Sequence, residues 1–254
     1  MGEDRGIEAA AQTDIGLVRH SNQDSFGGDD GLRLYAVCDG MGGAAGGEVA
    51  SRIAIDTFLT VARQEIEAVR GESNGSTGRA LQRAAAAANR AVCAKAAFDT
   101  RFRGMGTTLV AARIEGAELT ALNVGDSRAY LLRGDTLRQV TIDHSYLAEQ
   151  VERGLMTPEQ AEASSLQSVI TRAVGAEPDV HPDLFHEMLQ PHDTVLLCSD
   201  GLTRHVDDAD LAETMLAAQT EPADVVCERL VELAKERGGS DNITCWVIRI
   251  GEPA

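Results

Sequence analysis

The sequence has few basic residues, and it lacks the features of membrane-spanning and secreted proteins. Its 254 residues include 23 Lys and Arg against 40 Asp and Glu, which gives a formal charge of −17. Nucleic acids and anionic membranes need the opposite charge, so we expect neither as a partner. No apolar run approaches the length of a membrane span, and the start MGEDRGIEAA lacks the basic residues and apolar stretch of a secretory signal. We therefore predict a cytoplasmic protein.

The five cysteines exclude a disulfide framework and a cysteine-based zinc site. They are odd in number and scattered, mostly inside apolar runs, and no pair has CxxC spacing. This pattern indicates free thiols in a reducing compartment.

The hydrophobic content of 43% is enough for a packed core. Strand patterns alternate with two long helical patterns, so we predict a single α+β domain of layered sheets over residues 1–254. The predicted strands are 7–14, 32–38, 107–114, 118–124, 128–133, 136–140, 194–198 and a last one ending at Ile250, and the predicted helices are 46–70, 79–98, 207–218 and 222–236. The four strands within 107–140 are predicted to form one antiparallel meander, and 143–175 to form short helices and an active-site loop.

Aspartates recur where the predicted strands end or begin. Asp39 and Asp200 follow apolar runs, Asp126 follows one after Gly125, and Asp241 introduces the run ITCWVIRI. A single Asp-Gly pair would indicate only a turn, but this repetition needs a common cause. Carboxylates that converge on one sheet edge repel one another unless cations lie between them. Ligands that are all oxygen favour Mg²⁺ or Mn²⁺, and two such ions can catalyse phosphoryl transfer to water.

The segment RHSNQD adds a possible phosphate contact. Arg19 stands five residues before Asp24. A guanidinium group suits a phosphate dianion, and Asp24 could orient metal-bound waters. Without the other aspartates, an ordinary surface ion pair would be the better interpretation.

Eight segments in this order resemble the metal-dependent protein phosphatases of the type 2C serine/threonine class in their compact bacterial form: VRHSNQD, AVCDGMGG, GTTLVAA, NVGDSRAYLL, DHS, TRAVG, LLCSDGLT and SDNIT. The resemblance implies a four-layer α-β-β-α sandwich of two antiparallel sheets flanked by helices, with a mobile flap near 143–175. It also implies that the metal site lies at one end of the sandwich.

The resemblance also implies roles for individual residues. Asp39, Asp200 and Asp241 would hold two core ions, Mg²⁺ or Mn²⁺, with the Gly40 carbonyl as a further ligand. Asp24 would act through metal-bound water, and Asp126 would join Asp200 at a third, weaker metal position. Arg19 would bind the substrate phosphate.

The implied reaction is direct attack of a metal-bridging hydroxide on phosphoserine or phosphothreonine, without a phosphoenzyme. Met41 stands where many eukaryotic relatives carry a histidine proposed as general acid, so the leaving group would be protonated by water or by another residue. His144 in DHS is the nearest candidate by motif, although a loop histidine more often makes local hydrogen bonds.

The implied substrates are phosphorylated proteins, and the partner would be a bacterial-type serine/threonine kinase or a phosphorylated regulator, with the chain acting as a monomer. Two other functions stay open. The chain could be a binding module that senses metal or phosphopeptide, although the presence of Asp39, Asp200 and Asp241 argues against it. It could also be a metal-dependent hydrolase of small phosphate esters.

Overall fold

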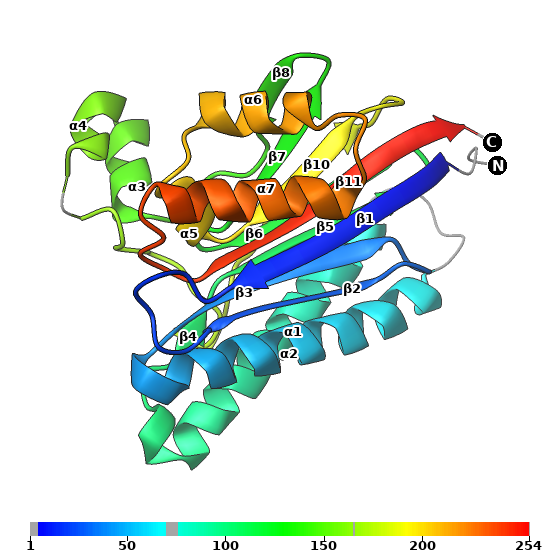
Figure 1. The fold of residues 1–254 in the computed structure, drawn as a ribbon. Coiled ribbons are helices and arrows are strands. Elements are labelled where there is room, and N and C mark those ends of the chain that lie inside the picture. Colours follow the sequence, from blue (N-terminus) through cyan, green and yellow to red (C-terminus); the bar gives the residue numbers. More distant parts are fainter. Residues whose placement is uncertain (1–4, 70–75, 165, 254) are drawn as a thin grey trace.

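Two antiparallel β-sheets lie face to face, and helices cover both outer faces (Figure 1). The structure is a computed structural model, and it describes residues 5–69, 76–164 and 166–253. The first sheet has the order β1 (Arg5–Asp14), β11 (Ile243–Pro253), β10 (Thr194–Cys198), β7 (Arg128–Arg133) and β8 (Thr136–Gln139). The second has the order β2 (Asp24–Asp29), β3 (Leu34–Met41), β5 (Leu109–Glu115), β6 (Glu118–Val124) and β9 (Asp183–Met188), with β4 (Gly106–Thr107) also paired to β3.

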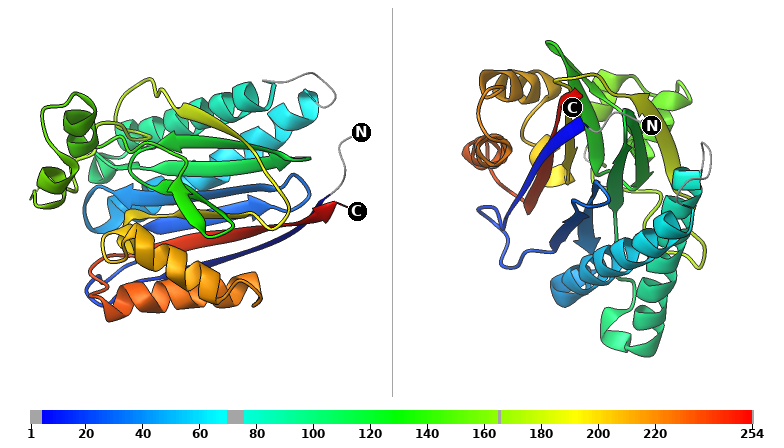
Figure 2. Two further views of the ribbon diagram at one scale, coloured as in Figure 1. Left: turned by 90° about the horizontal axis from the view of Figure 1, so that it is seen from above. Right: turned by 90° about the vertical axis from the view of Figure 1, so that its right-hand side faces the viewer.

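The helices form the two outer layers and a projecting segment (Figures 1 and 2). The second sheet is covered by α1 (Gly43–Ala68) and α2 (Ser76–Phe98), which are followed by a short 3₁₀ helix, η1 (Thr100–Phe102). The first sheet is covered by α5 (Asp200–Thr203), α6 (Asp208–Ala217) and α7 (Ala223–Glu236). The helices α3 (Tyr146–Glu152) and α4 (Pro158–Glu162) project from one end of the sandwich. This arrangement confirms the four-layer α-β-β-α sandwich.

Three apolar clusters correspond to the three interfaces between the layers. The central cluster joins the inner faces of the sheets and includes Val37, Leu131 and Ile248. One outer cluster lies between the second sheet and the helices α1 and α2, and the other lies between the first sheet and α5 to α7. Strands whose two faces both pack on another layer have no polar face, which is why β3, β5 and β10 read as continuous apolar runs.

The predicted meander over 107–140 is wrong. The hairpin β5–β6 belongs to the second sheet, whereas the hairpin β7–β8 belongs to the first. The chain crosses from one sheet to the other between Val124 and Arg128, where Gly125 has a φ of 107°. The strands β2 and β9 were also not predicted. As a consequence of the crossing, Asp126 lies at an end of the sandwich and not within a flat sheet.

The strand ends that carry the predicted site residues lie at one end of the molecule, on the left in Figure 1. There β3 leads into α1, β10 leads into α5, and β11 begins. The predicted short helices within 143–175 are α3 and α4, and they lie at this same end. The described ends of the chain lie together at the opposite end.

Candidate metal and phosphate site

Five aspartates from both sheets gather at this end of the sandwich. Asp24 on β2 and Asp39 on β3 are direct partners in the register of the second sheet. Asp126 lies in the crossing from β6 to β7, Asp200 is the first residue of α5, and Asp241 precedes β11. The structure thus brings together every aspartate that the sequence singled out.

The carboxylates perturb one another electrostatically. Burial raises the pKa of Asp39 well above its usual range, with Asp24, Asp200 and Asp126 adding repulsion and a hydrogen bond with Asp200 adding to the rise. Burial also raises the pKa of Asp126 to about 7, and the negative charge of Asp200 contributes to that rise. Negative charge in this cluster is therefore poorly compensated by the protein itself.

Asp24 is anchored through one of its two carboxylate oxygens. Its Oδ2 accepts hydrogen bonds from Ser199 Oγ at 2.8 Å and from Thr244 Oγ1 at 2.7 Å; Ser199 follows β10, and Thr244 lies on β11. Burial nevertheless raises the pKa of Asp24 to about 7, although these two hydrogen bonds act to lower it. Its Oδ1 is buried and has no hydrogen-bond partner, and the same is true of Oδ1 of Asp200. Buried oxygens of this kind are costly unless a cation or an ordered water satisfies them.

Two arginines neutralise the outer carboxylates. Arg19 Nη2 donates to Asp241 Oδ2 at 2.7 Å, and the Arg19 side chain is 49% exposed. Arg204, one helical turn after Asp200, donates to Asp200 Oδ2 through Nε at 2.8 Å and also through Nη2. Within the described part of the chain, no three His, Cys, Asp or Glu side chains are already arranged to share one ion. Asp241 would have to turn from Arg19 to become a ligand, whereas Asp200 could bind an ion through its Oδ1, which has no hydrogen-bond partner.

Arg204 was not predicted as a site residue from the sequence. Its only local signal is the i, i+4 spacing of an acid and a base in SDGLTR, and this spacing is common on helices that have no site. Ser199 and Thr244 were likewise not predicted as partners of Asp24, because these contacts join residues that are distant in the sequence.

The glycines that follow the aspartates allow close backbone contacts. A Cβ on Gly40 would lie 2.1 Å from the carbonyl oxygen of Gly47, and one on Gly201 would lie 1.9 Å from that of Asn242. Neither glycine has a positive φ. The Asp-Gly pairs are therefore not ordinary turns: glycine is needed so that neighbouring backbone can approach the segment that carries the carboxylate.

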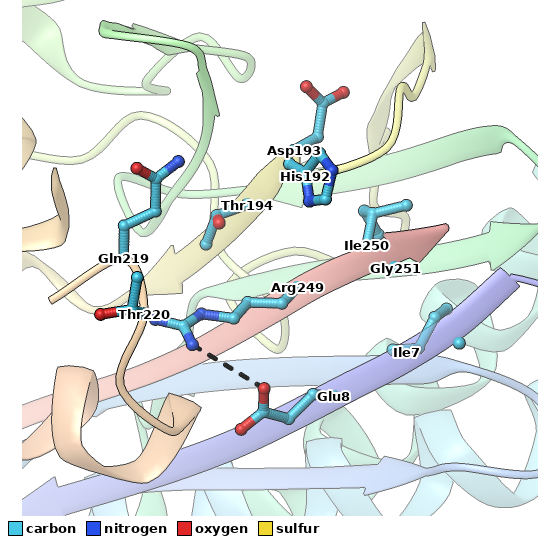
Figure 3. Close-up of a pocket in the computed structure, with 11 residues that line it drawn as sticks. Ile7, Glu8, His192, Asp193, Thr194, Gln219, Thr220, Arg249, Ile250 and Gly251 are labelled. Atoms are coloured by element: carbon cyan, nitrogen blue, oxygen red, sulfur yellow. Dashed lines mark ion pairs between the residues drawn. The ribbon is translucent and has the colours of Figure 1, made fainter. Parts of the chain in front are cut away.

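A hollow of about 520 Å³ lies at the opposite end of β1, β10 and β11 (Figure 3). Across it, Arg249 and Glu8 form an ion pair at 3.8 Å, and Arg249 Nη2 donates to the carbonyl oxygen of Ala218 at 2.7 Å. Its charged groups are thus satisfied by the protein, and it lies far along the strands from the aspartates.

The atoms of the aspartate cluster that could bind a metal ion fit hard divalent cations. They are all oxygens, they carry excess negative charge, and two of them are buried without partners. Carboxylate oxygen is the ligand type that Mg²⁺ and Mn²⁺ prefer, whereas no cysteine or histidine is needed here.

Comparison with known proteins agrees with this chemistry. The family model described as Protein phosphatase 2C matches residues 18–247. The chain belongs to the protein phosphatase 2C family. It is 37% identical over 247 residues to the serine/threonine phosphatase stp of Listeria innocua, and the match covers 95% of each chain.

Two further relatives of the protein phosphatase 2C family extend the comparison. The chain is 38% identical over 241 residues to the serine/threonine protein phosphatase PstP of Mycobacterium tuberculosis. This match covers 95% of this chain but only 44% of PstP. A crystal structure of the PstP catalytic domain in complex with two manganese ions has a TM-score of 0.83 at 36% identity, and it covers 97% of this chain and 99% of that one. By family, this chain is a metal-dependent phosphatase of the serine/threonine class.

Proposed function

We propose that this chain hydrolyses phosphoserine and phosphothreonine in proteins, in a reaction that depends on Mn²⁺ or Mg²⁺. The observation that carries the proposal is the gathering of five aspartates from both sheets beside an exposed arginine, with two buried carboxylate oxygens that lack partners. A membership in the protein phosphatase 2C family supports the same activity.

Membership in the protein phosphatase 2C family supports one assignment of ligands. Asp39, Asp200 and Asp241 would hold two ions together with the carbonyl of Gly40, and Asp126 and Asp200 would hold a third. Asp24 would act through metal-bound water: its Oδ2 is occupied by Ser199 and Thr244, and its unpartnered Oδ1 is the oxygen that would hold this water. When bound, the ions would polarise the phosphate and lower the pKa of a water that serves as the nucleophile.

The residues of the chain bind the substrate and compensate its charge. Arg19 turns from Asp241 to the phosphate dianion, and its guanidinium stabilises the negative charge that develops on the phosphoryl oxygens. Its half-exposed position leaves it accessible to a phosphorylated side chain.

A cysteine nucleophile is inconsistent with this site. Cys38 and Cys198 each lie next to the aspartate cluster in the sequence, and both are fully buried. Burial raises the pKa of Cys198 to about 12 and moves that of Cys38 in the same direction, so both thiols stay protonated at neutral pH. A phosphoenzyme on either of these thiols is therefore not expected.

The proposed setting is bacterial signalling in the cytoplasm. All five cysteines are free, which suits a reducing compartment, and no described helix is long and apolar enough to cross a membrane. The substrates would be a serine/threonine kinase or a regulator that such a kinase phosphorylates, and the chain would act as a monomer.

The first test is phosphate release from a phosphothreonine peptide, with Mn²⁺ or with EDTA. We expect release by the wild type with Mn²⁺ only. Asp39→Asn should reduce the rate by about 100-fold or more, because it removes a charged ligand at the centre of the cluster. Asp56→Asn is the matched control, since Asp56 is exposed on α1 and its substitution should leave the rate within about two-fold.

The result that would overturn the proposal is equal release by Asp39→Asn and the wild type, or release that EDTA does not affect. Far more efficient turnover of small phosphate esters than of the peptide would assign the chain to metabolite hydrolysis. Peptide binding without any release would make it a sensor.

A further inference from the structure

His144 lies where three segments of the chain meet beside Asp126. It follows β8 and precedes α3, and it is 4% exposed. Its backbone N–H donates to the Gly125 carbonyl at 2.9 Å, and its carbonyl accepts from the Thr171 N–H at 2.8 Å. The ring also contacts Gly125, because the Gly125 N–H donates to Nδ1 at 3.1 Å. His144 therefore binds both backbone polar groups of the residue that precedes Asp126.

These contacts fix the protonation of the ring. Since Nδ1 accepts a hydrogen bond, the proton of the neutral ring is on Nε2, which lies 3.1 Å from Asp183 Oδ2 and donates to it. Arg172 Nη1 also lies 3.2 Å from Nε2, but it cannot accept a hydrogen bond, and it donates to the other oxygen of Asp183 at 2.9 Å. Burial lowers the pKa of His144, which agrees with a neutral ring. Both ring nitrogens are thus engaged, and neither is free to protonate a leaving group.

The turn that His144 holds has little freedom of its own. Gly125 has a φ of 107°, and a Cβ there would lie 2.6 Å from the Thr108 side chain. Asn123 Nδ2 donates to the carbonyls of Gly125 and Ile142, each at 3.0 Å. The same histidine is joined to the far end of the 143–175 segment through Thr171. The turn at Asp126 and the base of that segment therefore share one buried residue.

We propose that His144 is a positioning residue that holds the Gly125–Asp126 turn and the base of the 143–175 segment in one fixed arrangement. The inference rests on the proposed function, in which Asp126 serves the third metal position. It assigns to His144 a role in placing a carboxylate, in place of a role as general acid.

The test uses three variants of the full chain. Asparagine places an acceptor near the position of Nδ1, glutamine places a donor near that of Nε2, and leucine removes both. Without added metal, His144→Leu and His144→Gln should speed amide hydrogen exchange at Gly125 by about five-fold or more, whereas His144→Asn should stay within about two-fold of the wild type. His186→Leu is the matched control, because His186 lies on β9 and contacts Glu118 and Thr120, not Gly125.

The second readout is the Mn²⁺ concentration that gives half-maximal hydrolysis of p-nitrophenyl phosphate and of a phosphothreonine peptide. We expect it to rise by about five-fold in the leucine and glutamine variants for both substrates, and to be restored by asparagine. Should His144→Leu fail to fold, the comparison of asparagine with glutamine still decides the question.

Three results would overturn the positioning role. One is unchanged exchange at Gly125 in the leucine and glutamine variants, and another is identical behaviour of asparagine and glutamine. The third is loss of activity on phosphothreonine alone, with normal hydrolysis of p-nitrophenyl phosphate, since a good leaving group does not need a general acid. The two proposals fail in different ways: failure of the phosphatase function is seen in the wild type itself, and failure of positioning only among the His144 variants.

Discussion

At the scale of single residues, the site depends on a hydrogen bond from a hydroxyl group of the first sheet to a carboxylate of the second. Thr244 Oγ1 on β11 gives its proton to Asp24, so the neighbouring Thr13 hydroxyl, 2.7 Å away, must donate to Thr244. Asn22 Nδ2 donates in turn to Thr13 Oγ1 at 2.8 Å. The hydrogen bonds thus run in one direction and end on the buried carboxylate, an arrangement in which each bond strengthens the next.

We predict that Thr244→Val lowers the free energy of unfolding by about 1–3 kcal/mol at pH 8, because a buried carboxylate loses one of its two donors while the side-chain volume is kept. Thr244→Ser should recover most of the loss. Thr120→Val is the matched control: Thr120 is also buried in a sheet, but its hydroxyl contacts no carboxylate among the described residues and lies 3.4 Å from His186 Nδ1. Urea unfolding of the three variants checks this, and equal losses for Thr244→Val and Thr120→Val would contradict it.

At the scale of elements, the alanine-rich composition of α2 sets the spacing of the helical layer. Ala80, Ala84, Ala85 and Ala88 are buried on the face that packs in the cluster with α1 and the second sheet. Small side chains permit a close approach of the two helices, and the layer has no space for larger ones.

We therefore expect Ala84→Leu to lower the free energy of unfolding by about 1–3 kcal/mol, because the added atoms force the helices apart. Ala94→Leu, at an exposed position of the same helix, should change it by less than about 0.5 kcal/mol. Denaturant titrations of both variants measure the difference. If Ala84→Leu were as stable as Ala94→Leu, the interface would have to contain unfilled volume.

The elements also show what the sequence could predict and what it could not. Buried strands such as β3 and β10 were predictable, because both of their faces are apolar and they leave a continuous local signal. The strands β2 and β9 were not, since they lie at the edges of the second sheet with alternating or partial exposure. The transfer of the chain between sheets at Gly125 was missed for another reason: hairpins look alike in sequence whichever sheet they join.

At the scale of the whole molecule, the site is where part of the excess negative charge is concentrated. The positions of Asp39, Asp126, Asp200 and Asp241 could be predicted, because each one stands beside a strand that has its own local pattern. The pairing of Arg19 with Asp241 could not, since these two residues are distant in the sequence, and Arg204 was missed because an i, i+4 pair of acid and base is common on helices that have no site. Because of this clustering, the free energy of unfolding should depend on pH, and bound metal ions should change that dependence.

Asp24 supplies the sharpest case. Its pKa is raised to about 7 in the folded protein, against about 3.9 for an unfolded aspartate. The folded state therefore holds the proton more tightly, so this group contributes stability below pH of about 4 that is lost as the pH rises to about 7. His144 acts in the opposite sense below about pH 6.5, because its pKa is lowered by burial. A comparison with a variant is therefore needed to isolate the aspartate.

In EDTA, we expect the free energy of unfolding of Asp24→Asn, relative to the wild type, to increase steadily between about pH 5.5 and 7.5, since the variant has no proton to lose. The matched control Asp56→Asn should run parallel to the wild type, because Asp56 is exposed on α1. With saturating Mn²⁺ the wild type should regain stability at the upper end of this range, as binding to the folded state alone stabilises it. Urea titrations at several pH values measure all three curves. Parallel curves for Asp24→Asn and the wild type in EDTA would show that the buried carboxylate keeps its ordinary pKa, and that the protein compensates the charge of the cluster without ions.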